Sequence, residues 1–481
     1  MNNLEVDIQT CKKIGYGLLA VYSVIAVIYV IFLARLNILP VIHMAIIVVL
    51  LAIIGVVLSL FHGESRLRSI ISSVVTIIIA GLLVIGTTFA QTTHVTIEEI
   101  TTIEVQTDVI SVFVLDEDEA ETIYDARNYL FGILRHVDRE NTNEAISEIN
   151  QLIDSDISTT EFEGMVDLAY ALRDNEVGAI IVNDALLRIV GDMEGYEWVR
   201  TDFRLLKMVE VETPVEEPLL EPPEELPDSF VMLITGIDTY GSVSARARSD
   251  TNILAVVNTV DREILLLSTP RDAFVTFDMS GDMGDKLTHA GIYGVEQSIS
   301  AIERLYDVNV DYFFRLNFTG FKEIISALGG IDVYSHYEFT VYPIRTYNVG
   351  WNRLNGIEAL AFVRERASFA AGDHQRAIHQ MEVIRAVVAE AASPSLLMNY
   401  NSVMTAVGDS FETNMPSDQL ADLVRMQLSD MSGWSITTFT TSGHSSRGQT
   451  FSMPGHNLYI IHLHDESIEE AKRLINETMG H

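Results

Sequence analysis

Charged residues that could bind an anion stand at the ends of predicted strands in the second half of the chain. Asp238 follows one strand-like run, and Arg248 and Asp250 directly precede the next. Arg271 follows a third run, which Pro270 ends. Sheets covered by helices place their sites at strand ends, so we expect these side chains to lie close together.

A second group of polar residues lies in the segment FVRERASFAAGDHQRAIHQ. If its FVRER part is extended, Arg364 and Arg366 point to the same side, whereas in a helix they diverge. Asp373, Arg376 and Gln380 are spaced i, i+3 and i+7, so they share one face of a helix. Asp373 is also suited to cap the start of that helix.

Together the two groups indicate a site for an anion of several charges and its metal ion. A lone arginine is best explained as a surface ion pair, but this many arginines at element ends of an acidic domain need another explanation. Guanidinium groups bind phosphate in a bidentate manner. Magnesium takes one or two carboxylates together with phosphate oxygens and water, and Asp238 and Asp250 are the candidate carboxylates.

The elements that must position these residues alternate between strands and helices. Val, Ile and Leu occupy both faces of the predicted strands, which indicates a central mixed β-sheet flanked by helices on both sides. We expect strands at residues 230–235, 252–257, 263–268, 312–317 and 331–334, and helices at 289–306, 318–328, 356–362 and 373–392. Residues 229–395 form the predicted catalytic core, and residues 396–481 supply helices and strands that complete it.

Three apolar runs precede this region, at residues 14–34, 39–60 and 70–90, and each matches the ~20 residues of a membrane-spanning helix. The fold class predicted is therefore a bundle of three transmembrane helices at residues 1–91, followed by α/β domains. Four basic residues flank one side of the bundle and only Arg35 flanks the other, which predicts a cytoplasmic N-terminus and an extracellular body. Localisation in the cell membrane, as a multi-pass protein, follows.

Two further segments separate the bundle from the predicted core. Residues 92–210 read as a smaller α/β accessory domain, to which the sequence assigns no chemistry. Residues 211–228 hold five of the chain's eleven prolines and seven acidic residues, which predicts a stiff, extended linker without a helix or a buried strand.

Charge and cysteine content exclude several classes of function. The chain carries a formal charge of −36, whereas residues 1–91 hold five basic and three acidic residues. An exported body this acidic is not expected to bind nucleic acid through its phosphates. Cys11 is the only cysteine, so the exported part contains neither a disulfide nor a thiolate metal site.

In motif order, residues 230–392 resemble the LytR-CpsA-Psr family of bacterial cell-envelope proteins. The motifs are ITGIDTYG, RARSDTNILAVVN, LLSTPRD, DKLTHAGIYG, YFFRLNFTGFKEIISALGGIDV, GWNRLNGIEALAFVRER and DHQRAIHQMEVI. The three spans and the small domain also look like the arrangement in members tied to streptococcal capsule attachment. The resemblance implies a phosphotransferase that moves a glycopolymer, teichoic acid-like or capsular, from a polyprenyl-(pyro)phosphate carrier to peptidoglycan, with magnesium as cofactor.

The resemblance also implies roles for individual residues. Asp238 and Asp250 would bind magnesium, and the pyrophosphate would be surrounded by Arg248, Arg271, Arg364, Arg366, Arg376 and Gln380. The prenyl chain would lie in an apolar tunnel, for which Phe313, Phe318, Phe321 and Leu328 are candidate wall residues, although core packing explains them equally well.

Arg271 and Asp373 are the predicted catalytic residues. Arg271 would neutralise charge that develops during phosphoryl transfer, and Asp373 would accept the proton of the attacking hydroxyl. Asp272 is the other candidate base, and a helix cap or a partner for Arg376 is the other role open to Asp373. The family usually has a basic residue directly before the glutamine, where this chain has His379, and this leaves the strength of pyrophosphate binding open.

Two other functions remain open on the sequence. A membrane-anchored regulator could bind lipid-linked precursors without turnover, and a pyrophosphatase could use water in place of the sugar hydroxyl. The sequence does not identify the glycopolymer, the acceptor position or the oligomeric state.

Overall fold

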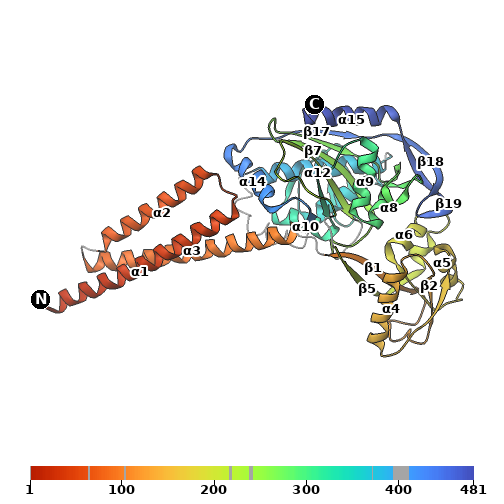
Figure 1. Cartoon of the computed structure of the whole chain (residues 1–481), viewed down its shortest axis with the longest axis horizontal. Helices are drawn as coiled ribbons and strands as arrows, with labels where there is room; N and C mark the ends of the chain where they lie inside the picture. The colour runs from red at the N-terminus through yellow and green to blue at the C-terminus, as the bar shows by residue number, and fades with distance from the viewer. Residues whose placement is uncertain are drawn as a thin grey trace.

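The computed structural model describes residues 2–62, 65–101, 105–215, 219–237, 242–370, 372–393 and 411–480. A long helical arm projects from a body of two α/β domains, with the N-terminus at the far end of the arm (Figure 1). The arm consists of α1 (Asn2–Leu36), α2 (Val41–Phe61) and α3 (Arg66–Thr101).

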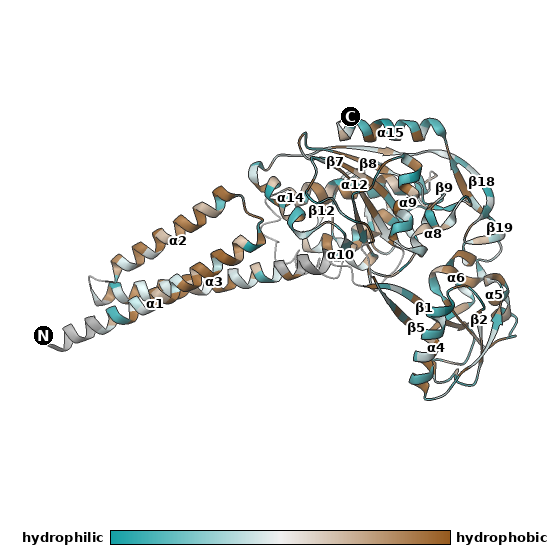
Figure 2. Ribbon diagram, in the orientation of Figure 1, coloured by the Kyte–Doolittle hydropathy of each residue, from teal (hydrophilic) through white to brown (hydrophobic). Residues whose placement is uncertain are grey.

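The three helices of the arm confirm the three predicted spans. Within the described residues each helix contains an apolar stretch long enough to cross a membrane, at Thr10–Leu36, Val41–Phe61 and Leu67–Thr93. The ribbon coloured by hydropathy shows hydrophobic residues along the described part of the arm, most continuously in α2 (Figure 2). The predicted boundary at residue 91 is too early, because α3 continues to Thr101. No glycine or proline interrupts residues 92–101, so nothing in the sequence ends the helix where the apolar run ends.

The accessory domain is a mixed sheet with helices, as predicted. Its described strands follow the order β3-β2-β4-β1-β5, in which β2 is parallel to β3 and β4, and β1 is antiparallel to β4 and β5. The elements are β1 (Val105–Leu115), β2 (Leu130–Leu134), α4 (Arg139–Ile153), β3 (Ser158–Phe162), α5 (Met165–Arg173), β4 (Ala179–Asn183), α6 (Asp184–Gly191), α7 (Trp198–Thr201) and β5 (Phe203–Pro214).

The predicted linker at residues 211–228 is wrong at its start. Strand β5 runs to Pro214, and Val211 is buried in the accessory core. β5 lies at the edge of its sheet, where a proline without a backbone N–H is tolerated. Further along, the carbonyls of Leu220 and Pro223 accept hydrogen bonds from Asn414 and Gln419, so this part of the linker lies against the catalytic domain.

The described residues of the catalytic domain form a six-stranded mixed sheet in the order β16-β11-β6-β7-β8-β17. Its strands are β6 (Ser229–Ile237), β7 (Ser249–Asn258), β8 (Glu263–Ser268), β11 (Tyr312–Leu316), β16 (Phe411–Thr413) and β17 (Ser435–Thr440). Strands β6, β7 and β8 are antiparallel neighbours, whereas β11 and β17 are parallel to β6 and β8. Because β16 and β17 lie beyond residue 395, the C-terminal region completes the sheet as predicted; residues 396–410 lie outside the described residues.

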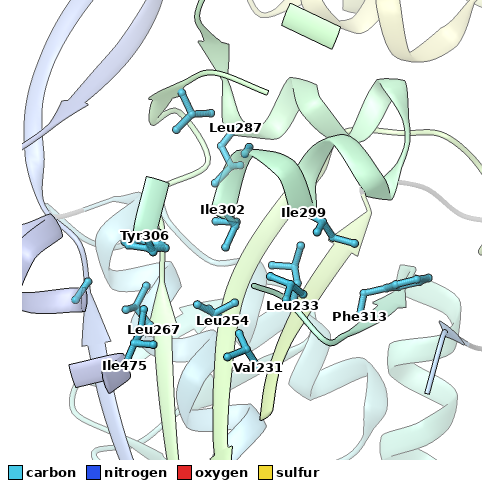
Figure 3. Close-up of a cluster of buried hydrophobic side chains, with 14 of the residues drawn as sticks. Val231, Leu233, Leu254, Leu267, Leu287, Ile299, Ile302, Tyr306, Phe313 and Ile475 are labelled. Carbon is cyan, nitrogen blue, oxygen red and sulfur yellow. The ribbon is translucent and has the colours of Figure 1, made fainter. Parts of the chain in front are cut away.

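Helices cover both faces of this sheet. On one face, α9 (Val295–Tyr306) and α15 (Asp465–Met479) pack on apolar strand residues; Ile299, Ile302 and Ile475 lie over Leu254 and Leu267 (Figure 3). On the other face, α12 (Asp373–Ala391) packs against alternate residues of β7 and β8. α10 (Phe318–Ala327) and α11 (Gly356–Arg364) pack together with α12.

The remaining elements form smaller units at the edges. The predicted strand at 331–334 is β12 (Ile331–Ser335), but it pairs with β15 (Gly350–Leu354) outside the central sheet. The predicted helix at 289–306 is divided before α9 by Gly294, whose φ of +123° favours glycine. The other elements are β9 (Phe274–Val275), β10 (Asp285–Lys286), α8 (Leu287–Ala290), β13 (Phe339–Val341), β14 (Arg345–Tyr347), α14 (Ser417–Asp430), β18 (Gly443–Thr450) and β19 (Met453–Leu463), with 3₁₀ turns at Asp278–Ser280 and Gly291–Tyr293.

Candidate active site

A cavity of about 650 Å³ lies between the catalytic sheet and helices α10, α11 and α12. Its lining changes along α12, where Arg376 and Gln380 in the first turns are followed by Val383, Ile384 and Val387. The cavity therefore has a cationic end near the start of α12 and an apolar end further along this helix.

Most of the predicted site residues gather at the cationic end. The cavity is lined by Arg248, Asp250, Arg271, Arg364, Arg366, Arg376 and Gln380. Asp238 lies outside the described residues. Arg364 is the last residue of α11, Glu365 is extended, and Arg366 follows, so the chain changes direction between the two arginines. The FVRER segment is therefore helical up to Arg364 and extended at Glu365, so each of the two conformations considered for it from the sequence applies to one part.

Arg271 and Asp250 form the centre of the site. The Nη1 atom of Arg271 donates to both carboxylate oxygens of Asp250, at 3.0 and 2.9 Å. Burial disfavours the charged form of Asp250, but Arg271, Arg248 and Arg376 outweigh it and hold the pKa of this carboxyl below its usual value. Burial has the same effect on Arg271, yet Asp250, Asp272 and Asp373 raise the pKa of its guanidinium. Both groups are therefore charged at neutral pH.

Asp373 lies among arginines rather than at a helix cap. The N-cap of α12 is Gly372, without a side-chain cap hydrogen bond, so the predicted capping role of Asp373 is wrong. Its carboxylate lies 3.4 Å from Arg271 Nε, 3.6 Å from Arg376 Nη2 and 3.8 Å from Arg366 Nη1. Asp373 Oδ1 is buried and makes no hydrogen bond to the described residues, so this oxygen is able to accept a hydrogen bond from a ligand.

Asp272, the other candidate base, pairs with Lys286 and lies 3.7 Å from Arg271 Nε. It is buried, and its Oδ1 accepts a hydrogen bond from Lys286 Nζ at 3.0 Å. The backbone N–H of Thr288 donates to the Arg271 carbonyl, and the Thr288 hydroxyl donates to Asp250. Residues 286–288, from the DKLTHAGIYG motif, thus fix the loop that carries Arg271.

His379, which stands where the family usually has a basic residue, is buried in the aromatic core. It is 1% exposed, stacks on Phe362 with ring centroids 4.2 Å apart, and lies 3.3 Å from the Phe362 carbonyl through Nδ1. Burial lowers the pKa of its imidazole to about 4, so the ring is neutral. Because His379 faces the aromatic core and not the cavity, its presence removes no cation from the site.

The candidate tunnel residues divide into two pairs. Phe318 and Phe321 line the cavity, and the Arg364 guanidinium lies 4.3 Å above the Phe318 ring. Phe313 and Leu328 are buried in the core and do not line the cavity, so core packing explains them. The apolar end also includes Ile234, Leu316, Val363 and Val388.

Three lining residues come from the accessory domain, and sequence reasoning missed them. Arg188, Asp192 and Arg200 line the same cavity as Arg248 and Arg271. Their spacing gives no signal of this, because it is the docking of two domains that brings them to the cavity. Pairing them with the catalytic motifs requires the tertiary structure.

The donor set suits magnesium only together with a phosphate ligand. Among the described residues, no group of three His, Cys, Asp or Glu side chains could hold a metal ion. Asp250 lines the cavity and is ionised, and magnesium bound to phosphates needs only one or two carboxylates. Asp250 thus fits a metal that a phosphate-bearing ligand would also coordinate.

The fold and the cavity define a membrane-anchored α/β protein whose binding site is cationic at one end and apolar at the other. The model of the LytR_cpsA_psr family matches residues 205–471, more than half of the chain. The chain belongs to this family.

Two relatives agree with this assignment. The polyisoprenyl-teichoic acid–peptidoglycan teichoic acid transferase TagU of Bacillus cereus is 34% identical over 193 residues, which cover 40% of this chain and 62% of that protein. TagT of Bacillus subtilis, with the same activity in its name, is 30% identical over 264 residues, covering 53% and 78%. The match thus spans less than two thirds of the length of TagU.

Among solved structures, the Lin1025 protein of Listeria innocua has 28% identity and a TM-score of 0.44, and covers 53% of this chain and 99% of its own. The crystal structure of B. subtilis TagT has 26% identity and a TM-score of 0.41, with coverage of 53% and 92%.

Proposed function

We propose that this protein is a phosphotransferase that moves a glycopolymer from a polyprenyl-(pyro)phosphate carrier to peptidoglycan. The observation that carries the proposal is a single cavity with arginines at one end and aliphatic and aromatic side chains at the other. A lipid-linked donor has the same two parts, a phosphate head and an apolar chain. The names of TagU and TagT describe this class of reaction for those relatives.

The arginines would bind the head of the donor. Arg271 and Arg376 are held in the site by Asp250 and Asp373, so their guanidinium groups are oriented before the donor arrives. Arg364, the last residue of α11, and Arg366, two residues later, also line the cavity and would supply further contacts to the phosphates. The prenyl chain would pack between α10 and α12, against Phe321 and Val387.

Magnesium is part of the proposal. Asp250, and Asp238 by the family motif, would hold the ion together with the phosphates of the donor. When bound, the ion would neutralise phosphate charge and thereby favour attack on phosphorus.

The residues of this chain would then act on the acceptor and the leaving group. Asp373 would accept the proton of a peptidoglycan hydroxyl as its oxygen bonds to the phosphorus attached to the glycopolymer. The bond from that phosphorus to the carrier breaks, and the carrier leaves as polyprenyl phosphate when the donor is a pyrophosphate. Arg271 would stabilise the negative charge that develops on the phosphoryl oxygens.

Tethering to a membrane serves this reaction, because a carrier lipid does not leave its bilayer. Within the described residues, Arg425 of α14 donates to the carbonyl of Asn37, in the turn between the first two spans. If α1 crosses a membrane, this contact means that the turn and the body would lie on one side of it and the N-terminus on the other. With the distribution of Lys and Arg, it supports a cytoplasmic N-terminus and an extracellular catalytic domain.

The proposal is tested with the full chain, magnesium, a lipid-pyrophosphate-linked glycan and peptidoglycan. We expect covalent transfer, and about a hundredfold loss in Arg271→Ala or Arg366→Ala. Arg304→Ala, which removes an exposed arginine paired with Asp278 on the same domain, is the matched control and should retain activity. Binding of the donor without transfer would favour the regulator, and phosphate release without an acceptor would favour the pyrophosphatase.

A further inference from the structure

The accessory domain reaches the catalytic cavity through the end of α6 and the short helix α7. Asp192 is the C-cap residue of α6, and Arg200 lies in α7. Both line the cavity beside Arg248, a catalytic-domain residue that is only 8% exposed. The cationic end of the cavity is therefore built from both domains.

One carboxylate joins the two domains at this point. Asp192 Oδ1 pairs with Arg200 and its Oδ2 pairs with Arg248, so a single acidic group bridges two guanidinium groups. Guanidinium N–H groups also bind phosphate oxygens, so the nitrogens that pair with Asp192 could pair with a phosphate in its place. Asp192 thus stands where an anionic ligand of Arg248 would bind.

Contacts elsewhere in the interface fix this geometry. The Thr107 and Ser244 hydroxyls lie 2.6 Å apart, and Arg246 donates to Asp108 at 3.0 Å across the same interface. The β18–β19 hairpin of the catalytic domain extends towards α6 (Figure 1), and its Met453 packs into the apolar core of the accessory domain. The position of Arg200 over the cavity therefore follows from domain docking rather than from a surface loop.

The charge around Arg200 also points to a ligand. Burial, together with the nearby charges of Arg248, Arg366 and Arg271, lowers the pKa of its guanidinium. Asp192 is the carboxylate paired with Arg200 among the described residues, and it is shared with Arg248. Two guanidinium groups thus share one carboxylate. An added anion would compensate the remaining positive charge, although the chain as a whole has a net charge of −36.

We propose that the accessory domain takes part in donor binding: Arg200 binds the phosphate-bearing head of the donor beside Arg248, and Asp192 is an internal anion that this head displaces from both arginines. The inference rests on the proposed function of the cavity and adds to it a role for the accessory domain. It also assigns opposite effects to two residues that touch each other. Loss of Arg200 should weaken binding, and loss of the Asp192 charge should strengthen it.

The test is calorimetric titration of the full chain in detergent with geranylgeranyl pyrophosphate, and separately with inorganic pyrophosphate. Arg200→Gln should weaken binding of both probes by about tenfold to a hundredfold, the value of a charge-assisted hydrogen bond. Asp192→Asn keeps the shape of the side chain and should tighten binding by about twofold to fivefold. The control is Arg135→Gln, because Arg135 is an arginine of the same domain, similarly exposed and paired with Glu161, that does not line the cavity.

Opposite signs separate this mechanism from a merely structural role. If Asp192 only held the domains together, Asp192→Asn would weaken binding as Arg200→Gln does, and that result would overturn the proposal. Unchanged binding in either variant would overturn it as well. If Arg200→Gln does not fold, Asp192→Asn decides alone, because both guanidinium groups remain in place.

Arg271→Ala distinguishes this inference from the proposed function. Wild-type binding that is lost in Arg271→Ala but unaffected in Arg200→Gln would refute the role of the accessory domain and leave the cavity's function intact. Absence of binding by the wild-type chain, or full binding by Arg271→Ala, would instead refute the proposed function.

Discussion

His379→Phe should make the folding stability of this protein less sensitive to acid. In the unfolded chain, histidine has a pKa near 6.5, whereas burial lowers the pKa of His379 in the folded chain to about 4. Between pH 6.5 and pH 4 the unfolded state binds more protons than the folded state. The part of the folding free energy that depends on neutral His379 is therefore present above pH 6.5 and is lost as the pH falls towards 4. The phenylalanine ring retains the stacking on Phe362 and Phe339 but cannot be protonated.

The size of the effect follows from the two pKa values. One pKa unit corresponds to about 1.4 kcal/mol, so His379 costs about 2 kcal/mol of stability at about pH 5 relative to about pH 7.5. For a domain of this size that is roughly 4–8 °C in Tm. Calorimetric melting of the full chain in detergent at the two pH values should therefore show a smaller fall in Tm for the variant than for the wild type.

A matched control is available on the same helix. His374 is exposed in the first turn of α12, so His374→Phe should keep the pH dependence of the wild type. Equal losses of Tm in the wild type and in His379→Phe would refute the argument, because they would show that His379 does not stay neutral in the folded chain.

Two further predictions concern the apolar end of the cavity and the buried support of the site. Val387→Trp should weaken binding of geranylgeranyl pyrophosphate about tenfold in calorimetric titration and leave binding of inorganic pyrophosphate unaffected. The reason is that the larger side chain overpacks the apolar end of the cavity, at a cost of about 1–3 kcal/mol that only the prenyl chain meets. Equal losses for both probes would contradict this placement of the prenyl chain. Lys286→Met should lower the free energy of unfolding by about 3 kcal/mol, because it removes the hydrogen-bonded partner of the buried Asp272 carboxylate and leaves only Arg271, 3.7 Å away. Thermal melting measures this loss; adding Asp272→Asn should recover part of it, and an unchanged Tm in the single variant would count against the pair.

Much of the fold followed from local patterns in the sequence. The three spans follow from run length alone, because ~20 apolar residues in succession have few alternatives to a membrane helix. The central strands follow from runs of Val, Ile and Leu, and Phe230 and Leu267 lie in strands close to where they were expected. Element ends were less well predicted: α3 and β5 both continue past the expected boundaries, since polar residues alone end neither a helix nor an edge strand.

The sequence by itself determined the residue types of the site and their order along the chain. It placed Arg248, Asp250 and Arg271 at strand ends, and these ends meet because neighbouring strands share an edge of the sheet. Only the tertiary structure decided what each face of α12 packs against, and so placed His379 in the aromatic core. It alone brought Asp192 and Arg200 to the cavity, because domain docking depends on contacts between residues far apart in the chain, and no local period encodes those contacts.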